Sequence, residues 1–151
     1  MDYSKKKIVF ISLESLIKTI SGADRPKDAT DCCIRKDVID RFRAMGMLSR
    51  VSILANRPSL SLGDFMPLGK SVEFFTFLYC GVAADIHVCY DDGARMMPGT
   101  GMVDEVIDVL PKGLKSLKGL LFVGCSETDM ETAEKCGIEY VNVEDFANGQ
   151  D

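Results

Sequence analysis

The sequence predicts an α/β fold in which helices cover both faces of a parallel sheet. Short apolar runs without polar alternation recur along the chain, as in strands that are buried on both faces. Stretches with helical periodicity lie between these runs, and strands that alternate with helices form a parallel sheet through right-handed crossovers. The expected result is a three-layer, doubly wound, Rossmann-like arrangement. The 151 residues, 46% of them hydrophobic and 27% charged, fit one domain over residues 1–151.

The first two expected strands flank the first expected helix. Residues 8–11 are a continuous apolar run rich in β-branched side chains, which predicts a strand buried on both faces. A polar stretch over residues 18–31 follows and predicts a long excursion. Apolar side chains then recur at helical spacing over residues 34–45, and Gly46 is expected to end that helix. Residues 51–54 predict the second strand.

The middle of the chain is less regular. Residues 72–78 are apolar with a helical or ambiguous period, and we expect a break before them at Pro67 and Gly69. Residues 86–90 predict a third strand, and Asp91-Asp92-Gly93 predicts the turn that follows it.

The last third of the chain returns to a clear alternation. Apolar spacing over residues 102–110 predicts a helix that ends at the following proline. Residues 120–123 predict a fourth strand, and residues 128–136 predict a helix that ends at Gly137. Residues 140–143 predict a short fifth strand.

Charge and composition narrow the possible functions. The net charge of −5 disfavours nucleic-acid binding, because no overall positive field attracts phosphates. No apolar run approaches the roughly 20 residues that cross a bilayer. The Lys5-Lys6-Lys7 run and the early Glu14 do not fit a signal peptide. We therefore expect a cytoplasmic protein without a membrane segment.

The cysteines do not predict a metal site. Six are present, none of them in a C-x-x-C pair, and His87 is the only histidine, so the ligand spacing of a structural zinc site is missing. In a cytoplasm we expect these thiols to be reduced.

In a doubly wound sheet, ligands bind at the carboxyl ends of the strands. The segments at these ends are S-L-E-S-L at residues 12–16, A-N at 55–56, M-M-P-G-T-G-M at 96–102 and V-G-C-S-E-T-D at 123–129. In this order they resemble the four motifs of the haloacid dehalogenase (HAD) phosphohydrolases. Those motifs are D-x-D-G-T, a Thr or Ser often followed by Asn, R-K-P-x-x-G-M and V-G-D-x-x-x-D. The branch they resemble holds the histidinol-phosphate phosphatases and polynucleotide 3′-phosphatases, and the resemblance implies a HAD-like core.

The resemblance also implies a two-step phosphatase chemistry. In the family, the first Asp attacks phosphorus to form an aspartyl-phosphate, and the Asp two residues later acts as acid and then as base. The first Asp and an acid of the fourth motif hold Mg²⁺, a Thr or Ser binds a phosphate oxygen, and a Lys balances the charge. In this sequence Ser12 stands at the position of the nucleophile and Glu14 at that of the acid. Ala55 stands at the position of the phosphate-binding hydroxyl, Met97 at that of the lysine, and Cys125 at that of the metal-binding acid. Asn56 and Asp129 match the family pattern.

These replacements predict the loss of ordinary HAD phosphatase chemistry. Mg²⁺ prefers carboxylate oxygen, whereas Cys125 offers a soft sulfur, and Met97 removes the charge that would offset a phosphate dianion. We therefore expect no magnesium cofactor, no metal site and no assigned catalytic residue at the degenerate positions Ser12, Glu14 and Met97. The expected ligand pocket consists of Ser12, Glu14, Ala55, Asn56, Met97, Cys125 and Asp129.

Each candidate also has a structural interpretation. Ser12 is either a nucleophile with Glu14 as its base or simply the end of a strand. Cys125 is either a reactive thiol, with a pKa lowered by the start of a helix, or a small buried residue. Asp129 fits a cap or first-turn acid of that helix, and Asn56 fits a residue that bonds backbone around the pocket.

The leading hypothesis is a HAD-like pseudophosphatase that binds a protein partner or a small ligand. It is expected to be capless, because residues 16–31 are too few for a large cap. The alternative is a magnesium-independent hydrolase that uses Ser12, Glu14 and Cys125, which should then meet around an open, polar pocket. A nucleic-acid repair adaptor is a third reading, which the acidic charge disfavours. The sequence leans toward a non-enzyme and leaves the oligomeric state open.

Overall fold

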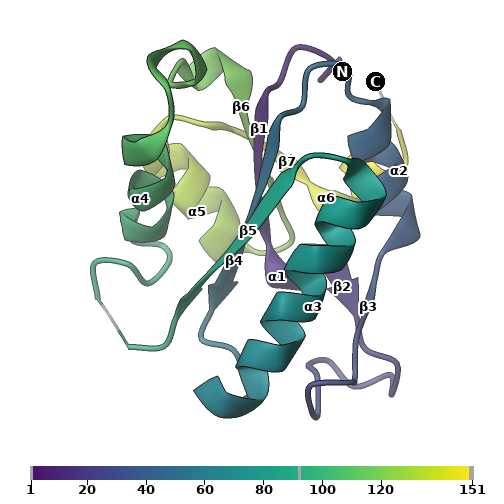
Figure 1. Cartoon of the computed structure of the whole chain (residues 1–151). Helices are drawn as coiled ribbons and strands as arrows, with labels where there is room; N and C mark the ends of the chain where they lie inside the picture. Colours follow the sequence, from purple (N-terminus) through teal and green to yellow (C-terminus); the bar gives the residue numbers. More distant parts are fainter. Residues whose placement is uncertain (1, 92, 150–151) are drawn as a thin grey trace.

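Five parallel strands form a sheet in the order β5-β4-β1-β6-β7, within residues 2–91 and 93–149 that the computed structural model describes. The strands are β1 (Ile8–Ser12), β4 (Arg50–Asn56), β5 (Ala83–Cys89), β6 (Leu120–Gly124) and β7 (Glu139–Asn142). Because β1 is central, its carboxyl end lies between those of β4 and β6 (Figure 1). The predicted doubly wound parallel sheet is confirmed.

Helices cover both faces of the sheet (Figure 1). One face is packed against α2 (Lys36–Ala44), α3 (Leu62–Cys80) and α6 (Val143–Ala147). The other face is packed against α4 (Gly101–Val109) and α5 (Glu127–Cys136). Two short 3₁₀ helices join α4 to β6, namely η1 (Lys112–Leu114) and η2 (Leu117–Gly119).

The central strand shows why its apolar run is unbroken. Ile8, Val9, Phe10 and Ile11 have no exposed surface. Val9 and Ile11 belong to the core under α2, α3 and α6, whereas Ile8 and Phe10 belong to the core under α4 and α5. A polar side chain at any of these positions would enter one core or the other, so the strand carries no alternation.

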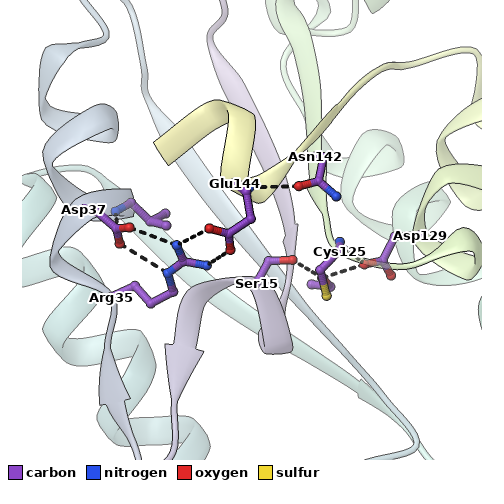
Figure 2. Close-up of polar contacts among 9 residues, drawn as sticks. Ser15, Arg35, Asp37, Cys125, Asp129, Asn142 and Glu144 are labelled. Carbon is purple, nitrogen blue, oxygen red and sulfur yellow. Dashed lines mark hydrogen bonds and ion pairs between the residues drawn. The ribbon is translucent and has the colours of Figure 1, made fainter. Parts of the chain in front are cut away.

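The polar excursion after β1 folds into a single helical turn and a small ribbon. The turn is α1 (Leu13–Leu16), and β2 (Ile17–Lys18) then pairs antiparallel with β3 (Cys33–Ile34). Arg35, only 8% exposed, donates a 2.8 Å hydrogen bond to Glu144, which ties the base of the ribbon to α6 (Figure 2). The sequence predicted the excursion but not these elements, because two-residue strands are too short to show a period.

The expected break at Pro67 and Gly69 is wrong, because both residues lie inside α3. Proline removes one helical hydrogen bond, but the packing of Phe65, Leu68 and Val72, each at most 2% exposed, outweighs this local cost. Gly69 also has a packing role. A Cβ at this position would lie 3.2 Å from the Phe65 ring of the same helix, so glycine leaves room for this buried ring.

Other boundaries also differ from the expected ones. The third strand begins at Ala83, three residues before its expected start, and α3 begins at Leu62, ten residues before the apolar stretch expected from Val72. The helix expected over residues 34–45 begins two residues later, because Ile34 pairs in β3. Val143, expected in the last strand, begins α6 instead. Gly137 ends α5 in the left-handed conformation with φ of 71°, as predicted. The turn expected after the third strand includes Asp92, which lies outside the described residues.

Two expectations from composition concern the chain as a whole. None of the described helices is long and apolar enough to cross a bilayer. All six cysteines are free thiols in the structure.

Candidate functional site

Ser12, at the nucleophile position implied by the resemblance, ends β1 and has no exposed surface. Its hydroxyl donates a 2.7 Å hydrogen bond to Oδ2 of Asp129. Its oxygen lies 2.7 Å from the Ser15 hydroxyl and 4.0 Å from the Cys125 sulfur. Because the single proton of Ser12 goes to Asp129, the Ser15 hydroxyl is the donor in the second contact. Neighbouring side chains therefore satisfy Ser12 inside the protein.

Asp129 lies in the first turn of α5 and is 4% exposed. Besides the Ser12 hydroxyl, its Oδ2 accepts a 2.9 Å bond from the backbone N–H of Cys125 (Figure 2). Its own N–H donates to Oγ of Ser126, the N-cap of the helix, at 3.1 Å. Ser126 thus caps the helix, and Asp129 is the expected first-turn acid, whose carboxylate binds the N–H of the residue before the N-cap.

Gly124 makes the approach of Asp129 possible. A Cβ on Gly124 would lie 2.6 Å from Cβ of Asp129 and 3.0 Å from the Tyr140 ring. Both separations are too short for nonbonded atoms, so a larger residue would push α5 away from the sheet. Gly124 at the end of β6 thus lets the Asp129 carboxylate contact Ser12 at the end of β1.

Asn56 and Met97 form a second cluster, at the end of β4. The Asn56 amide donates to the Met97 carbonyl at 3.2 Å, and its oxygen accepts from the Met97 N–H at 2.9 Å. The Met97 side chain is 4% exposed and belongs to the core under α4 and α5. Ala55, beside Asn56, has no exposed surface. Met97, which the resemblance places at the family's lysine position, is therefore part of the hydrophobic core.

The residues at the end of β1 do not fit a magnesium ion. Mg²⁺ needs several oxygen ligands, usually carboxylates and waters. The cluster offers one carboxylate, whose Oδ2 already accepts two hydrogen bonds, together with the hydroxyls of Ser12 and Ser15 and one thiol. Within residues 2–91 and 93–149, no group of three or more His, Cys, Asp or Glu side chains is arranged to hold a metal.

Glu14 is an exposed residue of α1 and lines a separate hollow of about 250 Å³, which we call the Glu14 pocket. The apolar side chains in its lining are Leu13, Ile17, Leu60, Phe65 and Leu68, and its polar ones include Lys18, Asp24 and Arg25. The surrounding protein removes water from the carboxyl and raises the pKa of Glu14, and the charge of Asp129 raises it further. Glu14 therefore keeps its proton to a higher pH than an ordinary glutamate.

The loop that forms one wall of the Glu14 pocket is held by Asp31. Its carboxylate accepts hydrogen bonds from the N–H and hydroxyl of Ser21, at 2.8 and 2.6 Å, and from the N–H of Lys27 at 3.0 Å. These donors lower the pKa of Asp31 from 3.8 to about 2. The loop is thus held over the full pH range above 3.8, and acid loosens it only as the pH falls from 3.8 toward about 2.

Cys125 differs from both of its sequence-based interpretations. It is exposed rather than buried. Partial burial of the thiol is the main cause that raises its pKa, and the negative charges of Asp129 and Glu14 add to the effect. This is opposite to the lowering expected at the start of a helix, so the reactive thiolate is disfavoured at neutral pH.

The predicted site residues therefore fall into three places. Ser12, Cys125 and Asp129 meet at the ends of β1 and β6. Asn56 and Met97 line a broad depression that also contains three cationic residues, Arg25, Arg57 and Lys135. Glu14 lines its own pocket, whose other walls come from the excursion after β1 and the start of α3. Sequence reasoning missed this pocket because its walls come from segments without periodicity.

Comparison with known proteins gives the fold. No protein-family model and no curated protein sequence matches the chain. Among solved structures it is similar to the D,D-heptose 1,7-bisphosphate phosphatase from B. bronchiseptica, solved with magnesium and phosphate. The TM-score is 0.68 at 16% identity, over 89% of this chain and 78% of that one. It is also similar to an uncharacterized protein from Listeria monocytogenes serotype 4b, with a TM-score of 0.55 at 12% identity over 90% and 77% of the chains. The chain has the HAD-like fold.

Proposed function

We propose that this chain is a capless, cytoplasmic pseudophosphatase of the branch that its motifs resemble, and that it acts by binding a small ligand or a protein partner. No magnesium cofactor takes part. The buried hydrogen bond between Ser12 and Asp129 carries this proposal. It occupies the end of β1, where a phosphatase of this fold places its nucleophile and its metal.

The burial of Ser12 supports the pseudophosphatase over a magnesium-independent hydrolase. A serine hydroxyl that donates to a carboxylate has the geometry of a nucleophile and its base. Attack on phosphorus, however, requires the oxygen to come within about 3–3.5 Å of it. Ser12 has no exposed surface, and Ser15 and Cys125 lie against it. The only histidine lies in β5, two strands away from β1, so it cannot act as an alternative base.

The Glu14 pocket is the hollow that best suits a small ligand. Its floor is apolar, and one carboxyl with a raised pKa stands at its edge, which is the usual composition of a binding pocket. An apolar molecule with one polar group would match this lining. Such a ligand would shift the amide NMR resonances of the loop over residues 19–26.

Turnover assays test the loss of chemistry. With Mg²⁺ present, we expect no hydrolysis of p-nitrophenyl phosphate or of a 3′-phosphorylated oligonucleotide above a mock purification. The reason is that the buried Ser12 oxygen cannot reach phosphorus and Met97 supplies no charge to offset the phosphate. The D,D-heptose 1,7-bisphosphate phosphatase, assayed with its own substrate, shows that the conditions support this chemistry. Hydrolysis that is absent from the mock sample and is abolished by Glu14→Ala would contradict the proposal.

A further inference from the structure

The helix α3 carries large apolar side chains around most of its circumference, although only the side that faces the sheet is buried by the rest of the chain. Phe65, Leu68, Val72 and Thr76 face the sheet and are buried. The side chains turned away from the sheet are also large and apolar, and each is 39–56% exposed. These residues, which we call the α3 patch, are Met66, Phe74, Phe75, Phe77, Leu78 and Tyr79. Figure 1 shows α3 along one outer side of the molecule.

A helix with apolar residues all round is normally enclosed on all sides. The 19 residues of α3 include three charged ones, Asp64, Lys70 and Glu73, and none from Phe74 to its end. The pattern indicates a protein surface that covers the outer side of α3.

The aromatic rings of the α3 patch contact one another, and a groove lies beside them. The Phe75 ring contacts Phe74 edge-on, with centroids 5.3 Å apart, and stacks on Tyr79 at 5.8 Å. These contacts fix the rings before any partner binds. Beside them, a groove of about 310 Å³ lies between α3 and β3, and Cys32, Ile34 and Phe75 are part of its lining.

We propose that a second copy of this chain covers the α3 patch, with the two α3 helices packed antiparallel across a two-fold axis. At about 200 Å² for each fully exposed side chain of this size, the patch exposes roughly 600 Å² per chain. Two copies would bury at most about 1,200 Å² from these residues, which is the lower end of the range for a stable interface. A single monomer rarely leaves a larger apolar patch in water.

Charge placement also favours a second copy. A two-fold axis midway between Lys70 and Glu73 places the patch against itself, since Met66 then lies opposite Phe77 of the partner subunit. The same axis brings Lys70 next to Glu73 of the partner subunit, twice across the interface. Each of the two charges in the middle of α3 therefore meets the opposite charge on the second copy. The C-terminal half of the helix has no charged residue that would attract a charged partner.

Sedimentation equilibrium tests the dimer. We expect the wild-type chain at about 50 µM to show twice the 16.6 kDa of one chain. Phe77→Glu, at a residue 52% exposed, should weaken dimerisation roughly thirtyfold or more, because it places a charge in an apolar interface. Phe74→Lys, at a residue 56% exposed, should act in the same way. Val109→Glu, the matched control at a residue of α4 that is 68% exposed, should leave the dimer intact.

Circular dichroism establishes that each variant is folded. Lys70→Glu should weaken the dimer several-fold, and the added change Glu73→Lys should restore it if the helices pair in the stated register. A monomeric wild-type chain at this concentration overturns the proposal. A dimer that survives both Phe77→Glu and Phe74→Lys overturns it as well, because the contact would then lie elsewhere.

Discussion

Asp129→Ala should lower the free energy of unfolding by about 2–4 kcal/mol. The Ser12 hydroxyl and the Cys125 N–H both donate to this carboxylate. The buried Ser12 hydroxyl left without an acceptor costs about 1–3 kcal/mol, and the loss of the partly buried Cys125 bond adds about 1 kcal/mol. Ser12 has no exposed surface, so water cannot replace the lost acceptor without opening the end of β1. Urea unfolding monitored by circular dichroism gives the change, provided that the m-value is unchanged.

Asp104→Ala is the matched control for Asp129→Ala. Asp104 is also a first-turn acid, on α4, but it is exposed and accepts a side-chain bond from Thr100 at 2.8 Å. Its removal should cost no more than about 1 kcal/mol. If Asp129→Ala is no more destabilising than this control, or raises stability, then the Asp129 carboxylate is strained and available for another ligand. That result would favour a metal or substrate site over a structural one.

Met97→Lys should also be strongly destabilising, by about 3–5 kcal/mol. The change restores the residue type that the family carries at this position, but here the side chain is 4% exposed and packs in the core under α4 and α5. A charge in that core would have to lose its proton or pull the 96–99 loop away from the Asn56 amide. Met97→Leu, which keeps the apolar volume, should stay within about 1.5 kcal/mol of the wild-type chain.

The same unfolding measurement decides the role of position 97. A Met97→Lys variant as stable as the wild-type chain would mean that the side chain reaches solvent along a short path. If that variant also bound inorganic phosphate, the site would be an intact phosphate cradle that lacks only its cation. The proposed loss of function at this site would then be wrong.

The strands and most helices were predictable because burial on both faces leaves a strong signal. The run from Ile8 to Ile11 has no polar residue, since each side chain enters one of the two cores. Gly137 similarly marks the end of α5, because its φ of 71° suits glycine. Pro67 predicted a helix break that the structure does not have, because the tertiary packing of α3 outweighs the local helix-breaking preference of proline.

The site was predictable only in part. Parallel strands that are neighbours bring their carboxyl ends together, so a meeting of Ser12 with Asp129 followed from the motif order. The motif order did not predict that the contact between Ser12 and Asp129 is buried. The burial depends on Gly124, which lets α5 approach the sheet to contact distance. The exposure of Cys125 and the direction of its pKa shift depend on the same three-dimensional surroundings, which no sequence pattern records.

A crystal structure of the chain soaked with magnesium and orthovanadate is the most direct measurement of whether the end of β1 still binds a phosphoryl group. We predict no vanadate or metal density at this position, with the Ser12 hydroxyl still 2.7 Å from Asp129 as in the unsoaked chain. Vanadate bonded to the Ser12 oxygen, or magnesium coordinated by Asp129, would contradict the account.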